Sequence, residues 1–120
     1  MLIAAREILS IIGDGTFLDH VFNKDADWDA ELDARDEAEF AETWSSSYDK
    51  LEAIDSSEGE VIREIRETVF KQTFRITQSP ELAGYVSDDF GLIAKAFENK
   101  IEIEFVNKLW DSYTKGSFPS

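Results

Sequence analysis

The side chains best equipped for chemistry in this chain are carboxylates, and most of them lie in one segment. Residues 25–60, here called the acidic segment, hold 14 of the 26 Asp and Glu residues but only two bases, Arg35 and Lys50. Such a segment offers oxygen ligands to metal cations and a negative potential to basic surfaces. Charge runs of this kind are also common on helix faces that simply remain solvated. The carboxylates therefore have to be judged by their spacing.

The first acids of the segment are spaced like part of a calcium-binding loop. Asp25, Asp27 and Asp29 would occupy positions one, three and five of such a loop, and Asp36 would occupy position twelve. Two departures argue against this site. Position six is Ala30 where the sharp turn requires glycine, and an aspartate at position twelve is one methylene shorter than the usual glutamate. We expect no metal here and interpret these acids as a helix N-terminus, where the macrodipole favours negative charge.

Other candidate sites carry weaker signals. Ser87, Asp88 and Asp89 have no evident partner group for acid–base or metal chemistry, and we interpret them as a helix cap or a kink. His20 is the single histidine and is interpreted as a partly buried structural residue. The chain has no cysteine and none of the common nucleophile, nucleotide-binding or zinc-protease motifs. We expect no catalytic residue, no cofactor and no enzymatic activity.

Aromatic residues accompany the acids. Trp28, Trp44 and Tyr48 lie within the acidic segment, and tryptophan and tyrosine dominate the energetics of protein interfaces because they bury a large area at little entropic cost. The same residues attach a helix to a core, and we expect Trp44 to serve both purposes. The residues predicted to contact a partner are Asp29, Asp33, Glu37, Glu42, Trp44 and Tyr48.

The net charge is uneven along the chain and limits the classes of partner. The whole chain carries −14, and residues 1–60, with 17 acids and 4 bases, account for −13 of it. Such a negative surface repels nucleic-acid phosphates and anionic lipids, so we expect no direct nucleic-acid or membrane binding. It attracts basic proteins and accelerates their association.

The charge therefore favours a non-enzymatic protein that binds or inhibits a basic partner protein through its acidic segment. Cytoplasmic inhibitors of basic nuclease toxins and phosphate mimics use the same charge logic, a likeness of class and charge only. Two alternatives stay open: a self-associating structural subunit, whose homodimer would use the C-terminal half, and a small metal-binding module.

The N-terminal residues do not have the order of a secretory signal. A signal peptide begins with basic residues and continues into an apolar stretch, whereas here the apolar residues come first and Arg6 is followed by Glu7. No apolar run approaches the roughly 20 residues that span a bilayer. We expect a cytoplasmic protein.

Hydrophobic residues recur at helical spacing through most of the chain. Residues 2–12 are predicted to form a helix, and residues 18–22 a short one. Residues 28–54 are predicted to form one long helix or two that break near the serines at 45–47. Asp36 interrupts the apolar seam of this segment.

The second half begins with clear helix-start signals. Ser57 and Glu60 have the spacing of a capping box, which predicts a helix over 58–77. Ser79 precedes a proline and an acid, which is a favourable start for a helix near 80–98.

Two segments of the second half leave alternatives. The polar triplet 87–89 either lies inside the helix near 80–98 or caps a second helix that splits it. Residues 101–105 alternate as a strand would, but the apolar residues step by four as far as Tyr113, and no partner strand is evident. We therefore favour a helix over 101–113.

Together these elements predict an all-α fold of about five helices in an irregular compact bundle, forming a single domain over residues 1–120. The helices at 58–77 and 80–98 are expected at its centre. The predicted core comprises the large apolar residues of these helices and the last one: Ile62, Ile65, Val69, Phe74, Leu82, Val86, Phe90, Ile93, Phe97, Phe105 and Leu109.

Overall fold

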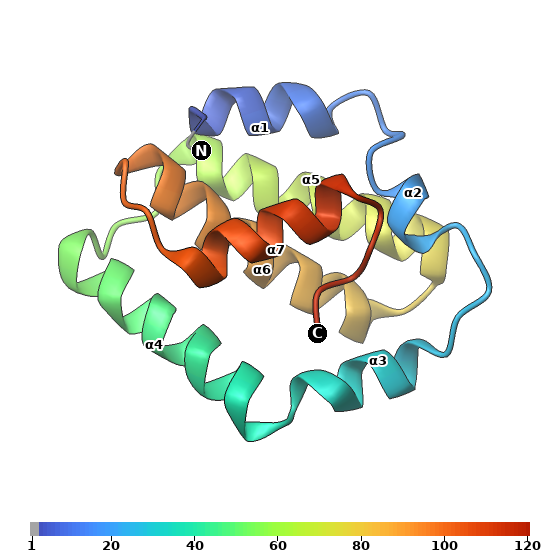
Figure 1. Cartoon of the computed structure of the whole chain (residues 1–120). Helices are drawn as coiled ribbons and strands as arrows, with labels where there is room; N and C mark the ends of the chain where they lie inside the picture. Colours follow the sequence, from blue (N-terminus) through green and yellow to red (C-terminus); the bar gives the residue numbers. More distant parts are fainter. Residues whose placement is uncertain (1–2) are drawn as a thin grey trace.

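Helices make up all the regular secondary structure in the computed structural model, which describes residues 3–120 (Figure 1). The seven helices are α1 (Ala5–Ile12), α2 (Asp19–Phe22), α3 (Trp28–Arg35), α4 (Ala38–Ile54), α5 (Glu60–Thr77), α6 (Pro80–Glu98) and α7 (Glu104–Thr114). The all-α prediction is confirmed, with seven helices in place of about five. Leu2, the first residue of the predicted helix 2–12, lies outside the described residues.

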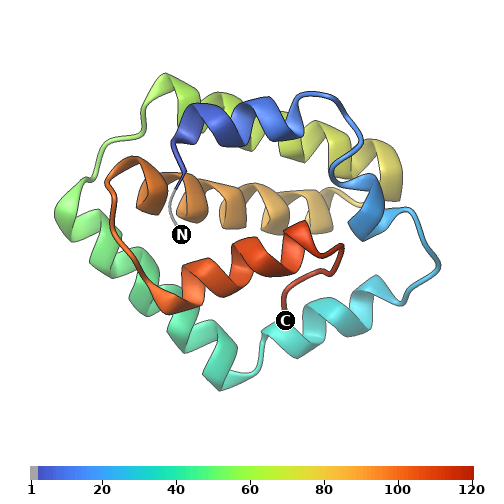
Figure 2. The same ribbon diagram turned by 45° about the horizontal axis from the view of Figure 1, so that its top comes forward.

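The centre of the molecule is the antiparallel pair α5 and α6, which pack along their whole length. In Figures 1 and 2, α1 lies across the outer side of this pair and α7 lies against α6. The turn between α5 and α6 is defined by two neighbouring residues. Gln78 adopts a left-handed conformation with φ of 59°, and the Ser79 hydroxyl caps α6 by accepting a hydrogen bond from the Leu82 amide at 3.1 Å. The predicted start of this helix is confirmed.

Helix α6 is buried on nearly every side because α1, α4, α5 and α7 all pack against it. It continues through the triplet 87–89 without a break, so a helix cap or a kink at that point was wrong. Ser87 and Asp89 are buried within it, and Asp89 is 0% exposed. A polar residue at the centre of the core requires partners, and these are described below.

Helices α3 and α4 form an angled pair along one edge of the molecule, cyan to green in Figures 1 and 2. The chain bends at residues 36–37, directly after the buried Arg35, and not at the serines 45–47. The serines lie within α4, and Ser47 satisfies its hydroxyl there by donating to the Thr43 carbonyl at 2.8 Å.

Two expected element boundaries were wrong. Ser57 does not cap α5, because its amide and hydroxyl both bond to the Asp55 carboxylate, at 3.0 and 2.6 Å, and the N-cap position is Gly59. Residues 101–103 are neither helix nor strand, and α7 begins only at Glu104. The helix predicted over 101–113 is therefore present from its fourth residue onward.

The core follows the predicted list with two exceptions. Phe74 is 41% exposed and Phe105 is half-buried. Phe74 lies one helical turn after Phe70, which is 37% exposed, on a side of α5 that the rest of the bundle leaves partly uncovered. Large buried residues that the list did not include are Ile8, Ile12, Leu18, Leu51, Trp110 and Tyr113.

Candidate functional site

The most distinctive surface of the molecule is the acidic arm, defined as residues 25–42, which covers α3, the bend after it and the start of α4. Within residues 3–120 no salt bridge engages any carboxylate of the arm. Most of these side chains are exposed, including all four acids predicted to contact a partner. The nine acids are Asp25, Asp27, Asp29, Glu31, Asp33, Asp36, Glu37, Glu39 and Glu42.

The single base of the acidic arm does not balance these charges, because it points into the core. Arg35 is 5% exposed, and its two terminal nitrogens donate to the two carboxylate oxygens of Asp89 at 2.6 and 2.7 Å. The positive charge of Arg35 is thus matched by a buried aspartate of α6. The outer face of the arm keeps its carboxylates without an exposed cation.

Asp89 joins four elements through its two oxygens. Besides Arg35 of α3, it accepts a hydrogen bond from the Trp44 indole nitrogen of α4 at 2.9 Å and one from the Tyr113 hydroxyl of α7 at 2.6 Å. Each oxygen therefore accepts two hydrogen bonds, all of them charge-assisted because the acceptor is a carboxylate, which is the saturation that a buried carboxylate needs. We call these four residues the Asp89 cluster.

The Asp89 cluster shifts the titration of its members. Burial raises the pKa of Tyr113 well above its ordinary value of 10.0, and the negative charge of Asp89 raises it further. For Arg35, burial lowers the pKa, but its hydrogen bonds to Asp89 and the charge of that carboxylate outweigh the burial, so the pKa is raised. Near neutral pH the guanidinium therefore stays charged and the phenol stays neutral.

Aromatic rings complete the surroundings of Arg35. Its guanidinium carbon lies 4.8 Å from the centre of the Phe40 ring, 4.9 Å from that of Phe118 and 5.4 Å from that of Tyr85. Such cation–π contacts strengthen when the cation is removed from water. The buried arginine and the rings around it therefore help to hold the arm to the core, together with the buried Leu32.

The two aromatic residues predicted to contact a partner lie beside each other on α4. Trp44 is half-buried, and Tyr48 is 46% exposed, with ring centres 5.8 Å apart and planes inclined by 14°. From helical periodicity they lie roughly 200° and 240° around α4 from Glu42. Glu42 and the aromatic pair thus occupy different sides of this helix. Trp44 is attached to the core through Asp89, and its contact with a partner stays a prediction.

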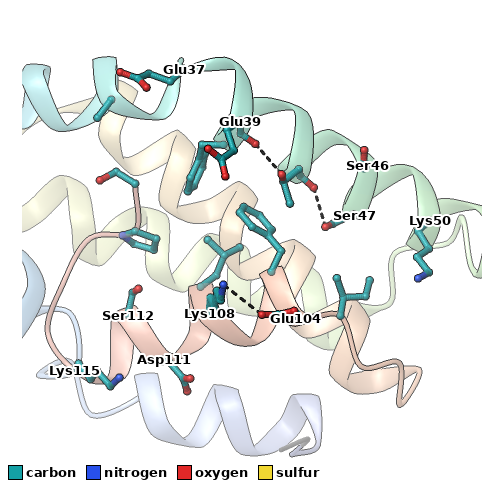
Figure 3. Close-up of a pocket in the computed structure, with 18 residues that line it drawn as sticks. Glu37, Glu39, Ser46, Ser47, Lys50, Glu104, Lys108, Asp111, Ser112 and Lys115 are labelled. Carbon is teal, nitrogen blue, oxygen red and sulfur yellow. Dashed lines mark hydrogen bonds and ion pairs between the residues drawn. The ribbon is translucent and has the colours of Figure 1, made fainter.

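A groove of about 960 Å³ runs between α4, α7 and the C-terminal residues (Figure 3). Its floor is apolar and includes Phe40 and Phe105, whose rings meet edge to face at 5.2 Å. Its rim mixes charges: Lys108 lies 3.3 Å from Glu104 in an ion pair marked in Figure 3. Acidic, basic and hydroxyl groups all line this groove, a mixture suited to the polar rim of a polypeptide interface. The polar lining residues labelled in Figure 3 are Glu37, Glu39, Ser46, Ser47, Lys50, Glu104, Lys108, Asp111, Ser112 and Lys115, of which Ser47 is buried.

The described residues contain no metal centre and no membrane span. Asp27, from the apparent calcium-loop pattern, instead caps α3 by accepting a hydrogen bond from the Ala30 amide at 3.1 Å. No group of three or more His, Cys, Asp or Glu side chains in residues 3–120 is arranged to hold a metal ion. Over the same residues, every helix is too short or too polar to cross a bilayer.

Two interpretations that were drawn from the sequence were wrong. His20 is exposed and not partly buried. Asp89, interpreted as part of a cap or kink, is the residue around which the Asp89 cluster forms. One signal did exist for it: Val86, Phe90 and Ile93 surround it on the apolar face of the helix, so a carboxylate at that position must be buried with partners.

Comparison with known proteins adds one finding. Residues 7–120 match the family model described as "Immunity protein PIM1". A search of curated proteins yields no match.

Proposed function

Because this chain belongs to the family of immunity protein PIM1, we propose that it binds a toxin protein, inhibits it, and makes the contact with its acidic arm. The observation that carries the proposal is the set of nine carboxylates in residues 25–42 with no exposed cation among them. Arg35, the base that could have balanced them, is committed to Asp89 inside the core.

The charge of the arm indicates a basic partner surface. Clustered exposed carboxylates raise the association rate with a cationic protein and disfavour acidic competitors. Exposed ion pairs add little affinity individually and are screened by salt. The acidic arm would therefore steer and align the toxin, and apolar contacts beside it would supply most of the binding energy.

We further propose that inhibition is stoichiometric and takes place in the cytoplasm, without catalysis and without direct contact with nucleic acid or membrane. The support for this is chemical. The chain has no cysteine, and its single histidine is exposed. An anionic arm suits the masking of a basic surface that the toxin itself uses to hold an anionic substrate.

Charge reversal tests the proposal. A basic, toxin-sized protein encoded by the neighbouring open reading frame would be the first candidate partner, and its affinity would be measured for wild type and for a variant with Asp29, Asp33, Glu37 and Glu42 changed to Lys. We expect wild-type binding to weaken as salt increases, and the variant to lose binding while its helical circular dichroism stays intact. Unchanged affinity in the variant would remove the acidic arm from the interface.

A matched control separates local charge from total charge. Four exposed acids outside the arm, Glu7, Glu64, Glu81 and Glu98, form no salt bridge within residues 3–120. Their change to Lys alters the net charge by the same amount. We expect this control to bind the toxin within about threefold of wild type, since distant charges are screened.

Self-association is a second candidate role, favoured by one observation. Phe70 and Phe74 are both more than a third exposed on one side of α5, in the C-terminal half where a homodimer is expected. Light scattering over a range of concentrations tests it. A dimer that disappears when both residues are changed to Ser would support this role, and a monomer at all concentrations would dismiss it.

A further inference from the structure

A small pocket lies where the bend between α3 and α4 faces α6. Its volume is about 190 Å³, and it lies on the α6 side of α4, whereas the larger groove lies on the α7 side. Eight residues line it: Arg35, Asp36, Phe40, Ala41, Trp44, Ser45, Tyr85 and Asp88. The pocket thus adjoins both the acidic arm and the Asp89 cluster.

The lining combines aromatic rings with carboxylates. Phe40, Trp44 and Tyr85 are all half-buried, so their rings are shielded from water without being enclosed. Asp36 and Asp88 are exposed at the same pocket. Ring faces and carboxylates attract the same ligand, an organic cation, and the attraction grows where water is partly excluded.

Of the two carboxylates at the pocket, one is not paired with a cation. Both terminal nitrogens of Arg35 are bonded to Asp89, so Arg35 adds no net positive charge. Asp36 has no salt bridge within residues 3–120, whereas Asp88 forms a partly exposed ion pair with Arg66 of α5 at 2.9 Å. Burial raises the pKa of Asp88, opposed by the charge of Arg66. A second cation nearby would further stabilise the charged form of this carboxylate.

The fold itself shows that these rings accept a guanidinium group. Arg35 places its guanidinium carbon 4.8 Å from the Phe40 ring centre and 5.4 Å from that of Tyr85. We propose that the open side of this pocket receives one arginine or lysine side chain of the partner protein, and that the pocket is an anchor point of the interface beside the acidic arm. This rests on the proposed function for the identity of the partner, but the pocket itself can be tested without the toxin.

The test uses short peptides as probes. The full chain, labelled with ¹⁵N, would be titrated with acetyl-Gly-Arg-Gly-amide, its lysine counterpart, and the citrulline peptide, which has nearly the shape of arginine without its charge. The reporter is the indole N–H resonance of Trp44, assigned with Trp44→Phe. We expect a saturable shift with the two cationic peptides and none with citrulline. No saturable shift, or an equal shift with citrulline, would overturn the proposal.

Variants locate the binding. Tyr85→Leu and Asp36→Asn should each weaken the arginine peptide by about threefold or more, from the loss of a ring face or of a charge. Tyr85→Phe keeps the ring and should retain binding. It is the matched control for Tyr85→Leu, because it changes the same position without removing the ring. Glu64→Gln removes an exposed charge on α5 and should change nothing. Equal binding by Tyr85→Leu and wild type would refute this location.

The two proposals fail separately. If the peptides bind and the charge-reversed arm still captures the toxin, the pocket stands and the acidic arm falls. If the arm is needed for the toxin and the peptides do not bind, the arm stands and the pocket falls.

Discussion

The guanidinium group of Arg35 and the carboxylate of Asp89 form a two-point ion pair inside the protein, between residues 54 positions apart in the sequence. This pair attaches α3 to α6 and turns the only base of the acidic arm away from solvent. The same contact therefore helps to hold the arm in place and also leaves its outer face negative. The architecture of the core and the electrostatics of the surface depend on the same two side chains.

Removal of the charge of Asp89 should be strongly destabilising. Asp89→Asn leaves the Arg35 charge buried without a counterion, which costs about 3 kcal/mol or more of the free energy of unfolding. Urea titrations followed by circular dichroism would measure it. In the double variant with Arg35→Met, no unpaired charge remains, so its loss should be smaller than the sum of the two single losses. A loss below about 1 kcal/mol for Asp89→Asn would contradict the role of the pair.

Tyr113 should make the protein sensitive to alkaline pH. Its pKa in the folded state is well above 10.0, chiefly because of burial, whereas the unfolded chain releases the same proton near 10. The folded state therefore binds more protons above that pH, so its stability is full below about pH 10 and falls as the pH rises further.

Tyr113→Phe is the matched variant for this pH dependence. It should cost about 1.5–3 kcal/mol at neutral pH, because a hydrogen bond to a charged group is lost. It should also show a shallower fall in the free energy of unfolding between pH 9 and 11, a range chosen to bracket the ordinary tyrosine pKa of about 10. Parallel pH profiles for the two proteins would exclude Tyr113 as the source of the slope.

Gly84 should be replaceable with a gain in stability. It lies inside α6, and a Cβ built at this position meets no atom within 4 Å. Alanine in a helix interior is favoured over glycine by about 1 kcal/mol, so Gly84→Ala should raise the free energy of unfolding by up to that amount. Thermal unfolding would measure the change, and a lower melting temperature would show that the position is more crowded than its contacts indicate.

The serines before the two central helices should respond differently to mutation. Ser79→Ala removes the hydroxyl that caps α6 and should cost about 1 kcal/mol. Ser57→Ala should cost less, because its hydroxyl bonds to Asp55 and does not cap α5. Denaturant unfolding of the two variants side by side distinguishes these roles, and a larger loss for Ser57→Ala would reverse them.

Sequence reasoning anticipated most of the helices because their signals are local. The Ser79 cap, the apolar stripes of α5 and α6 and the exposed acids of α3 and α4 depend on residues within a few positions of each other. The predicted partner residues were identified from composition and from aromatic type. Glu42 and the aromatic pair lie on different sides of α4, an arrangement that follows from helical periodicity and that composition and residue type do not contain.

The sequence by itself determined that this chain is helical, that its negative charge gathers in the first half, and which large apolar residues of α5 and α6 lie at the centre of the core, Phe74 excepted. The tertiary structure decided that Arg35 turns inward, that the chain bends at residues 36–37, and that Asp89 lies among Arg35, Trp44 and Tyr113. Helical periodicity records only near neighbours along the chain, whereas the partner of a buried charge comes from another helix and is fixed when the helices pack.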